Sequence, residues 1–185
     1  MRTEPLAKTV QTILKKILLE NLAVTRLACQ QRAKFEGWLK FELAVALAQQ
    51  TGFQKIILED GYNISGRSDI SFERNGVKWY IEMKTANTNW RAEGLEKITR
   101  PVTRNMDGVS EDIRILRIKA THGLAVFCIF PIPSRLWKNT REQLDYHLRR
   151  IEETSGLEDG ILLQNAQYVE ISQEFGVCTF AIEVV

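Results

Sequence analysis

The stretch GRSDISFERNGVKWYIEMK, from Gly66 to Lys84, decides the fold that this sequence predicts. It is typical of two β-strands joined by Asn75-Gly76. This dipeptide favours a type I′ turn, because both central residues of that turn need a positive φ. A two-residue turn fixes the register of a hairpin, so the residues that lie opposite each other can be counted outward from the turn.

Counting outward places Asp69 directly opposite Glu82, at a non-hydrogen-bonded position where side chains approach most closely. Alternation along the strands puts both acids, together with Lys84, on one face of the hairpin. Two like charges in these positions repel, and a cation between them would turn the repulsion into binding. A slip of one residue would turn Asp69 to the other face and remove the site.

Length and composition describe an ordinary globular chain. The 185 residues suit one domain over residues 1–185, and 44% apolar with 26% charged residues exclude disordered and collagen-like classes. A net charge of only +2 excludes a polycation, so any nucleic-acid binding must come from a local patch.

The cysteines and the apolar segments indicate where the protein resides. Three widely separated cysteines show no CxxC or Cys/His spacing, which argues against zinc and predicts reduced thiols in a cytosolic protein. No apolar run suits a signal peptide or a membrane span. We therefore expect a cytoplasmic protein without a membrane partner.

Hydrophobic periodicity predicts the remaining elements. Apolar residues repeat at helical spacing at Leu6, Val10, Ile13, Leu14, Ile17 and Leu18. Further helices are expected at about 34–50, from about 108–110 to 120 with Ser110 as N-cap, and at 138–154. Further strands are expected at 55–59, 123–132, 169–171 and 177–185, the last two as a second hairpin. Residues 85–109 are polar and give no clear pattern. This order predicts an α/β domain in which a mixed central sheet is flanked by helices.

The acidic pair and the lysine are the groups that phosphodiester hydrolysis needs. Carboxylate oxygens are natural ligands of Mg²⁺, which keeps several waters and completes its shell with phosphate. The ion polarises the phosphate and lowers the pKa of bound water. A nearby lysine can stabilise the negative charge that grows in the transition state.

The arrangement of Asp69 before Ile81-Glu82-Met83-Lys84 resembles the PD-(D/E)XK, or restriction-endonuclease-like, nuclease superfamily. The resemblance covers about residues 34–130. It implies a core of a helix, a three-strand meander, a helix and a strand, here with an extra N-terminal helix and C-terminal strands. It also implies that Asp69 and Glu82 bind Mg²⁺, with Mn²⁺ as a substitute, and that Lys84 assists catalysis. Ser68 stands where the family has a proline, which contributes no ligand.

Many members of that superfamily add a glutamate from the preceding helix. Two candidates exist here, Glu36 and Glu42. Because they are six positions apart, they point in different directions. Glu42 adjoins the apolar stripe of Leu39 and Leu43 and is the preferred catalytic and metal-binding residue, with Glu36 as the alternative.

Basic residues concentrate after the motif, at Arg91, Lys97, Arg100, Arg104, Arg114, Arg117 and Lys119. Together with Trp90 they could hold a phosphate backbone and stack a base. The alternative is a solvated loop and helix face. The resemblance implies DNA as the substrate and a homodimer as one way to cut two strands.

Three interpretations of function follow. The first is a Mg²⁺-dependent endonuclease that hydrolyses phosphodiester bonds in DNA. The second is a catalytically silent module with the same fold that binds nucleic acid or protein. A purely structural alternative for Asp69 and Glu82 is that they pair with Lys84, Arg67 or Lys78 in surface ion pairs worth about 0–1 kcal/mol each. The third, a hydrolase of another class, is minor, because the chain has no G-x-S-x-G, P-loop or HExxH pattern.

Overall fold

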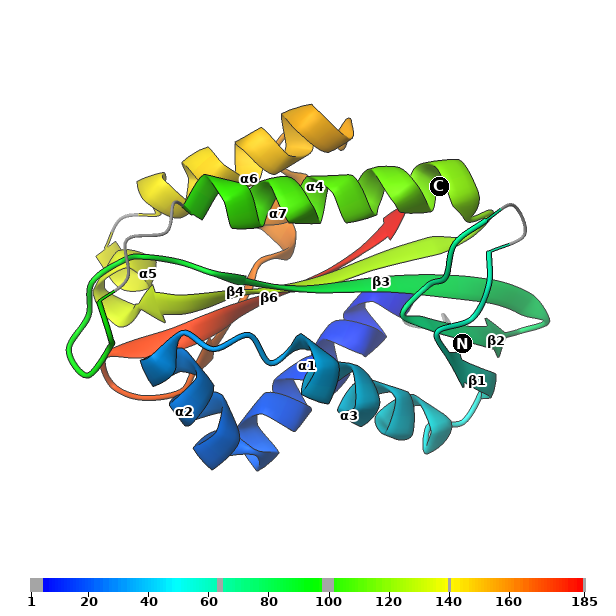
Figure 1. The fold of residues 1–185 in the computed structure, drawn as a ribbon, viewed down its shortest axis with the longest axis horizontal. Helices are drawn as coiled ribbons and strands as arrows, with labels where there is room; N and C mark the ends of the chain where they lie inside the picture. The colour runs from blue at the N-terminus through cyan, green and yellow to red at the C-terminus, as the bar shows by residue number, and fades with distance from the viewer. Residues whose placement is uncertain (1–4, 63–64, 98–101, 140, 185) are drawn as a thin grey trace.

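A six-stranded mixed sheet forms the middle layer of the molecule, and helices cover both of its faces (Figure 1). The computed structural model describes residues 5–62, 65–97, 102–139 and 141–184. The strands are β1 Phe53–Leu58, β2 Ile70–Arg74, β3 Val77–Asn87, β4 Gly123–Pro133, β5 Gln167–Glu170 and β6 Phe175–Val184. Their order across the sheet is β1-β2-β3-β4-β6-β5. The predicted class, a mixed sheet flanked by helices, is confirmed.

The helices divide between the two faces of the sheet. They are α1 Leu6–Glu20, α2 Leu22–Gln31, α3 Glu36–Ala48, α4 Val102–Lys119, α5 Ser134–Asn139, α6 Glu142–Ser155 and α7 Ile161–Asn165. Residues of α1, α2 and α3 pack in one apolar cluster, and residues of α4, α6 and α7 pack in another. Strand β4 lies between the two clusters and is buried along its whole length, as expected for a strand that is covered on both faces.

The strands pair in the order in which they follow in the chain up to β4. Strands β1, β2 and β3 form an antiparallel meander that follows α3. The chain then crosses through α4 and returns as β4, parallel to β3. Strands β5 and β6 pair antiparallel, which confirms the predicted second hairpin.

The turn between β2 and β3 has the predicted geometry. Asn75 has a φ of 53° and Gly76 a φ of 77°, as a type I′ turn requires. Pairing runs from Arg74 with Val77 to Ile70 with Ile81. The register that was counted from the sequence is therefore confirmed as far as Ile70.

The N-terminal helix also follows its pattern. All six apolar residues at helical spacing are buried in α1, where they pack as one stripe, namely Leu6, Val10, Ile13, Leu14, Ile17 and Leu18. Figure 1 shows α1 beside α3 on the same side of the sheet.

Helix α4 differs from its prediction. It begins at Val102, before the expected start near residues 108–110. Ser110 lies inside the helix, where its hydroxyl donates to the carbonyl of Met106 at 3.4 Å, so its predicted role as N-cap is wrong. Gly108 is also helical, and a Cβ added there would lie 3.6 Å from Cε of Lys84. The glycine at this position thus borders the Lys84 side chain.

Two further differences concern short elements. Helices α2, α5 and α7 were not predicted, whereas the helix expected at 138–154 corresponds to α6, which begins at Glu142 and ends at Ser155. Among the described residues, no helix is both long and apolar enough to cross a membrane.

Candidate active site

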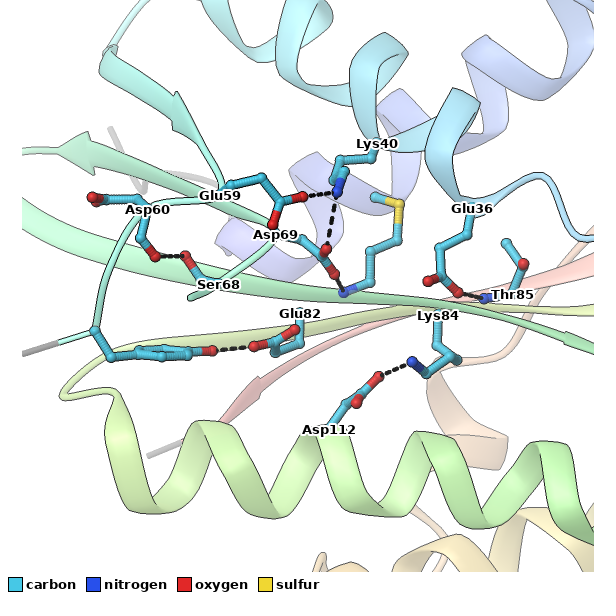
Figure 2. A network of polar contacts seen from close by, with 12 residues as sticks. Glu36, Lys40, Glu59, Asp60, Ser68, Asp69, Glu82, Lys84, Thr85 and Asp112 are labelled. Atoms are coloured by element: carbon cyan, nitrogen blue, oxygen red, sulfur yellow. Dashed lines mark hydrogen bonds and ion pairs between the residues drawn. The ribbon is translucent and has the colours of Figure 1, made fainter. Parts of the chain in front are cut away.

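The candidate site lies where β3 continues beyond the end of β2. Pairing between these strands stops at Ile70 and Ile81, but β3 runs on to Asn87. Backbone N–H groups at a strand edge need acceptors. The N–H of Met83 donates to Oδ2 of Asp69 at 2.7 Å, and the N–H of Thr85 donates to Oε2 of Glu36 at 2.9 Å. Two carboxylates therefore take the place of the missing strand (Figure 2).

Asp69 does not occupy the position that was counted from the turn. Its backbone N–H donates to the carbonyl of Ile81 at 3.0 Å, so the regular ladder does not extend to an Asp69–Glu82 pair. In Figure 2 the Asp69 carboxylate lies on the α3 side of β3, whereas Glu82 and Lys84 point toward α4. The prediction that the three side chains share one face is wrong. Asp69 nevertheless stays close enough for its charge to contribute to the raised pKa of Glu82.

The helix carboxylate at the site is Glu36 and not the preferred Glu42. Glu36 and Lys40 are one turn apart, so both face the sheet, where they contact Thr85 and Asp69. Glu42 is two residues beyond Lys40, about 200° further around the helix, and points away from that contact. The pair of a glutamate and a lysine at i and i+4 was the signal in the sequence that could have decided between the two candidates.

Lys40 is a site residue that sequence reasoning missed. Its ammonium lies 3.3 Å from Oδ1 of Asp69 and forms an ion pair with Glu59. Burial alone would lower the pKa of Lys40, but the bonds to Glu59 and Asp69 outweigh it and raise that pKa. The lysine is therefore charged at neutral pH, and it places a cation beside Asp69.

Glu82 is half-buried in surroundings that disfavour its charged form. Burial raises the pKa of Glu82 to about 7, against a hydrogen bond from the hydroxyl of Tyr62 that lowers it. The charges of Asp69 and Asp112 raise it further. Near neutral pH this carboxyl is thus divided between its charged and its protonated form, as expected for an acid that lacks a full positive partner.

Lys84 is paired with Asp112 of α4. Its Nζ lies 3.0 Å from Oδ2 of Asp112, a buried oxygen that receives no hydrogen bond of good geometry. Burial raises the pKa of Asp112 to about 6, although the charge of Lys84 opposes the change. Burial by itself would lower the pKa of Lys84, but Asp112, Glu36 and Asp69 together raise it. Asp112 was not predicted to belong to the site, because α4 was expected to begin only shortly before it.

The acids of the site offer the oxygen ligands that Mg²⁺ prefers, but among the described residues they are not gathered into one metal-binding group. Figure 2 shows Glu36 and Asp69 on the α3 side of β3, and Glu82 and Asp112 on its α4 side, where Asp112 contacts Lys84. Within the part of the chain that the structure describes, no group of three or more His, Cys, Asp or Glu side chains is arranged to hold a metal ion. A closed site built from protein alone is therefore not formed. Mg²⁺ does not need one, since it commonly binds through one or two carboxylates and completes its shell with waters and phosphate.

The predicted basic patch separates into residues with different surroundings. Arg114 pairs with Glu111 at 3.1 Å, and Arg117 donates to the carbonyl of Ser155 at 2.7 Å. Lys119 lies over the ring of Tyr62, 5.9 Å from its centroid. The side chains of Arg91, Lys97 and Arg104 are exposed, and Arg100 lies outside the described residues. Trp90 packs against the second apolar cluster and beside His147, which indicates a structural role.

No family model, curated protein or solved structure matches this chain. The residues of the site and their geometry are therefore what indicates a function.

Proposed function

We propose that this protein is a Mg²⁺-dependent nuclease that hydrolyses phosphodiester bonds in DNA, as its resemblance to the PD-(D/E)XK superfamily implies. The observation that carries the proposal is the free edge of β3. There, backbone N–H groups fix the carboxylates of Asp69 and Glu36 next to Glu82 and Lys84. The order of α3, the meander β1-β2-β3, α4 and the parallel β4 supports the same proposal.

Each residue of the site has a role in this proposal. Asp69 and Glu82 would hold the ion, and Glu36 would bind one of its waters. The ion, when bound, polarises the scissile phosphate and lowers the pKa of a bound water. Lys84 keeps its proton beside Asp112 and stabilises the negative charge that develops on the phosphate.

A cleavage assay with Mg²⁺ or Mn²⁺ on duplex, single-stranded and branched DNA tests the proposal. We expect Glu82→Ala and Lys84→Ala to lose about 100-fold or more in rate, the usual effect of removing one electrostatic contact to a transition state. Glu42→Ala is the matched control, because Glu42 lies on the same helix as Glu36 but points away from the contact of Lys40 with Asp69. If Glu82→Ala and Lys84→Ala both cleave as fast as the wild type, the assignment is wrong.

A second candidate is a module with this fold that binds nucleic acid or protein without cutting. The observation in its favour is that both acids already have partners, since Lys40 pairs with Asp69 and Tyr62 donates to Glu82. The orientation of Asp69, whose carboxylate lies on the other side of β3 from Glu82, also favours this second candidate. Titration with Mn²⁺ in a calorimeter separates the two functions, because the nuclease binds the ion and the module does not.

A further inference from the structure

A buried arginine holds the loop at residues 88–97, which follows β3. Arg32 is only 5% exposed, and each nitrogen of its guanidinium donates to a backbone carbonyl of that loop. The acceptors are the carbonyls of Thr88, Trp90 and Glu96. We propose that the pocket beside this guanidinium binds a phosphate group of a nucleic-acid strand. The inference rests on the nucleic-acid substrate of the proposed function, but not on cleavage.

The charge of Arg32 is not balanced by an acid. Among the described residues no carboxylate pairs with it, and carbonyl oxygens are its acceptors. Burial lowers the pKa of Arg32, as expected for a cation that is removed from water. A guanidinium has five N–H donors in a planar fork, so two remain for a ligand beyond the three carbonyls. An anion bound there supplies the counter-charge that a buried cation needs.

A pocket of about 230 Å³ lies beside Arg32, and its lining includes Asn89, Arg91, Glu96 and Lys97. Three of these side chains are positive and one is acidic. Within the part of the chain that the structure describes, neither Arg91 nor Lys97 forms an ion pair. Pockets for drug-sized ligands have about 300–1,000 Å³, so this smaller space suits one phosphate group with water. Arginine binds phosphate through paired, charge-assisted hydrogen bonds, which favours this ligand.

A second basic pocket continues the first one. It has a volume of about 620 Å³ and shares Arg91 with the pocket beside Arg32. Its lining adds Arg135 and Lys138 of α5 and the acids Glu93 and Glu174. In Figure 1 the loop after β3 lies at the end of the sheet where α2 and α5 also lie. A free phosphate occupies one pocket only, whereas a nucleic-acid strand carries a phosphate at every nucleotide and extends into the next. This continuity favours a strand as the source of the phosphate.

The pocket lies along the strand that carries the candidate active site. Nδ2 of Asn87, the last residue of β3, donates to the carbonyl of Arg32 at 2.8 Å. Glu36, which accepts from β3 in the candidate site, follows Arg32 by four residues. Asn89 is five residues beyond Lys84, which is at most about 18 Å in an extended chain. One strand of B-DNA covers this length in about five nucleotides. A strand at the candidate site therefore reaches the pocket within a few nucleotides.

Binding of labelled DNA in EDTA, measured by fluorescence anisotropy at several salt concentrations, tests the inference without cleavage. We expect the double variant Arg91→Gln/Lys97→Gln to bind about 10-fold or more weakly at about 0.1 M salt. The slope of log K against log salt should fall by about 1–2, because each lost phosphate contact removes about 0.7–0.9. The matched control, Lys16→Gln/Arg149→Gln, removes two charges from exposed ion pairs of α1 and α6 and should bind like the wild type.

Nuclear magnetic resonance of the wild type tests the part of Arg32 without a substitution in the buried site. Addition of DNA should shift the signal of the Arg32 Nε–H group. Inorganic phosphate serves as the second probe and should shift the same signal at higher concentration. Far-UV circular dichroism verifies that the double variants are folded.

The outcomes separate this inference from the proposed function. If the folded Arg91→Gln/Lys97→Gln protein keeps the affinity and salt slope of the wild type, the inference is overturned and the nuclease proposal stands. An equal loss in the control also overturns it, because net charge alone then explains the binding. A shift of the Arg32 signal with inorganic phosphate but not with DNA overturns the strand as the source. Binding that depends on Arg91 and Lys97, without cleavage in Mg²⁺, supports the inference and contradicts the nuclease.

Discussion

At the scale of single residues, hydrogen bonds fix the positions of the acids in the site, but few positive charges balance them. Backbone N–H groups of β3 donate to Asp69 and Glu36, which favours the orientation of both carboxylates toward β3. Glu82 is half-buried beside them and accepts a hydrogen bond from the hydroxyl of Tyr62. Such an arrangement favours function over stability, because a buried acid without a cation prefers its neutral form.

The stability of the metal-free protein should therefore depend on pH through Glu82. The pKa of this group is raised to about 7 by burial, so the folded state binds the proton more tightly than the unfolded state does. Below about pH 4.5 Glu82 is protonated in both states and does not destabilise the fold. As the pH rises toward 7, the unfolded state loses this proton first, and the free energy of unfolding falls. We expect Glu82→Gln to be more stable than the wild type at pH 8 by about 1–3 kcal/mol, and by much less at pH 5.

Denaturation with urea in the presence of a chelator, at both pH values, measures this difference. Addition of Mg²⁺ at pH 8 should stabilise the wild type and not the Gln variant, because only the wild type keeps both acids of the site. If Glu82→Gln raised the free energy of unfolding equally at pH 5 and pH 8, the prediction would be contradicted. A raised pKa of Glu82 requires this difference between wild type and variant to grow with pH.

The sequence predicted which strand residues meet but not how they are oriented. The register count is correct from Arg74 to Ile70, because a two-residue turn determines it. It fails at Asp69, where the carboxylate and not the backbone takes the next N–H of β3. The alternation of apolar and polar residues does not reveal where a side chain replaces a backbone hydrogen bond between two strands. Lys40 was missed for a related reason, since its partners lie on other elements.

At the scale of elements, the turn of the central hairpin carries a measurable part of the stability. Gly76 has a φ of 77° and no heavy atom within 4 Å of an added Cβ, so replacement by alanine adds only backbone strain. We expect Gly76→Ala to lower the free energy of unfolding by about 1–2 kcal/mol.

Gly37 is the matched control for this substitution. A Cβ there also meets nothing within 4 Å, but Gly37 lies in helix α3. Because alanine favours a helix, Gly37→Ala should raise the free energy of unfolding by about 0.5 kcal/mol. Thermal denaturation of both variants measures the contrast, and a Gly76→Ala protein as stable as the wild type would show that the turn is not under strain.

Elements with a clear period were predictable and elements with a polar surface were not. The six apolar residues of α1 repeat at helical spacing, and β4 is an unbroken apolar run, so both were identified. The first half of α4 is rich in polar residues and contains Gly108, which lowers helix propensity. Its helical state depends on packing against β3, where Asn105 donates to the carbonyl of Asn87 at 2.8 Å. Contacts of this kind are not visible in a local pattern.

At the scale of the whole molecule, the sheet separates two apolar layers that share its strands. The three cysteines are divided between the two layers. Cys29 and Cys128 belong to the apolar cluster that contains α1, α2 and α3, and Cys178 belongs to the cluster that contains α4, α6 and α7. All three are free and buried. The sequence had predicted reduced thiols, and the structure describes no disulfide among them.

The reactivity of these thiols should therefore follow the unfolding of the whole sheet. Burial raises the pKa of Cys29 to about 12 and raises those of Cys128 and Cys178 well above their usual value, so hardly any reactive thiolate exists in the folded protein at pH 8. We expect no fast reaction with a disulfide reagent in the native state and three reactive thiols in guanidinium. In mild denaturant all three should react at one common rate, because β4 lies in both layers and neither can open without it. Mass spectrometry of the modified peptides measures each rate separately. A Cys178 that reacts well before Cys29 and Cys128 would show that the α4 side of the sheet opens on its own.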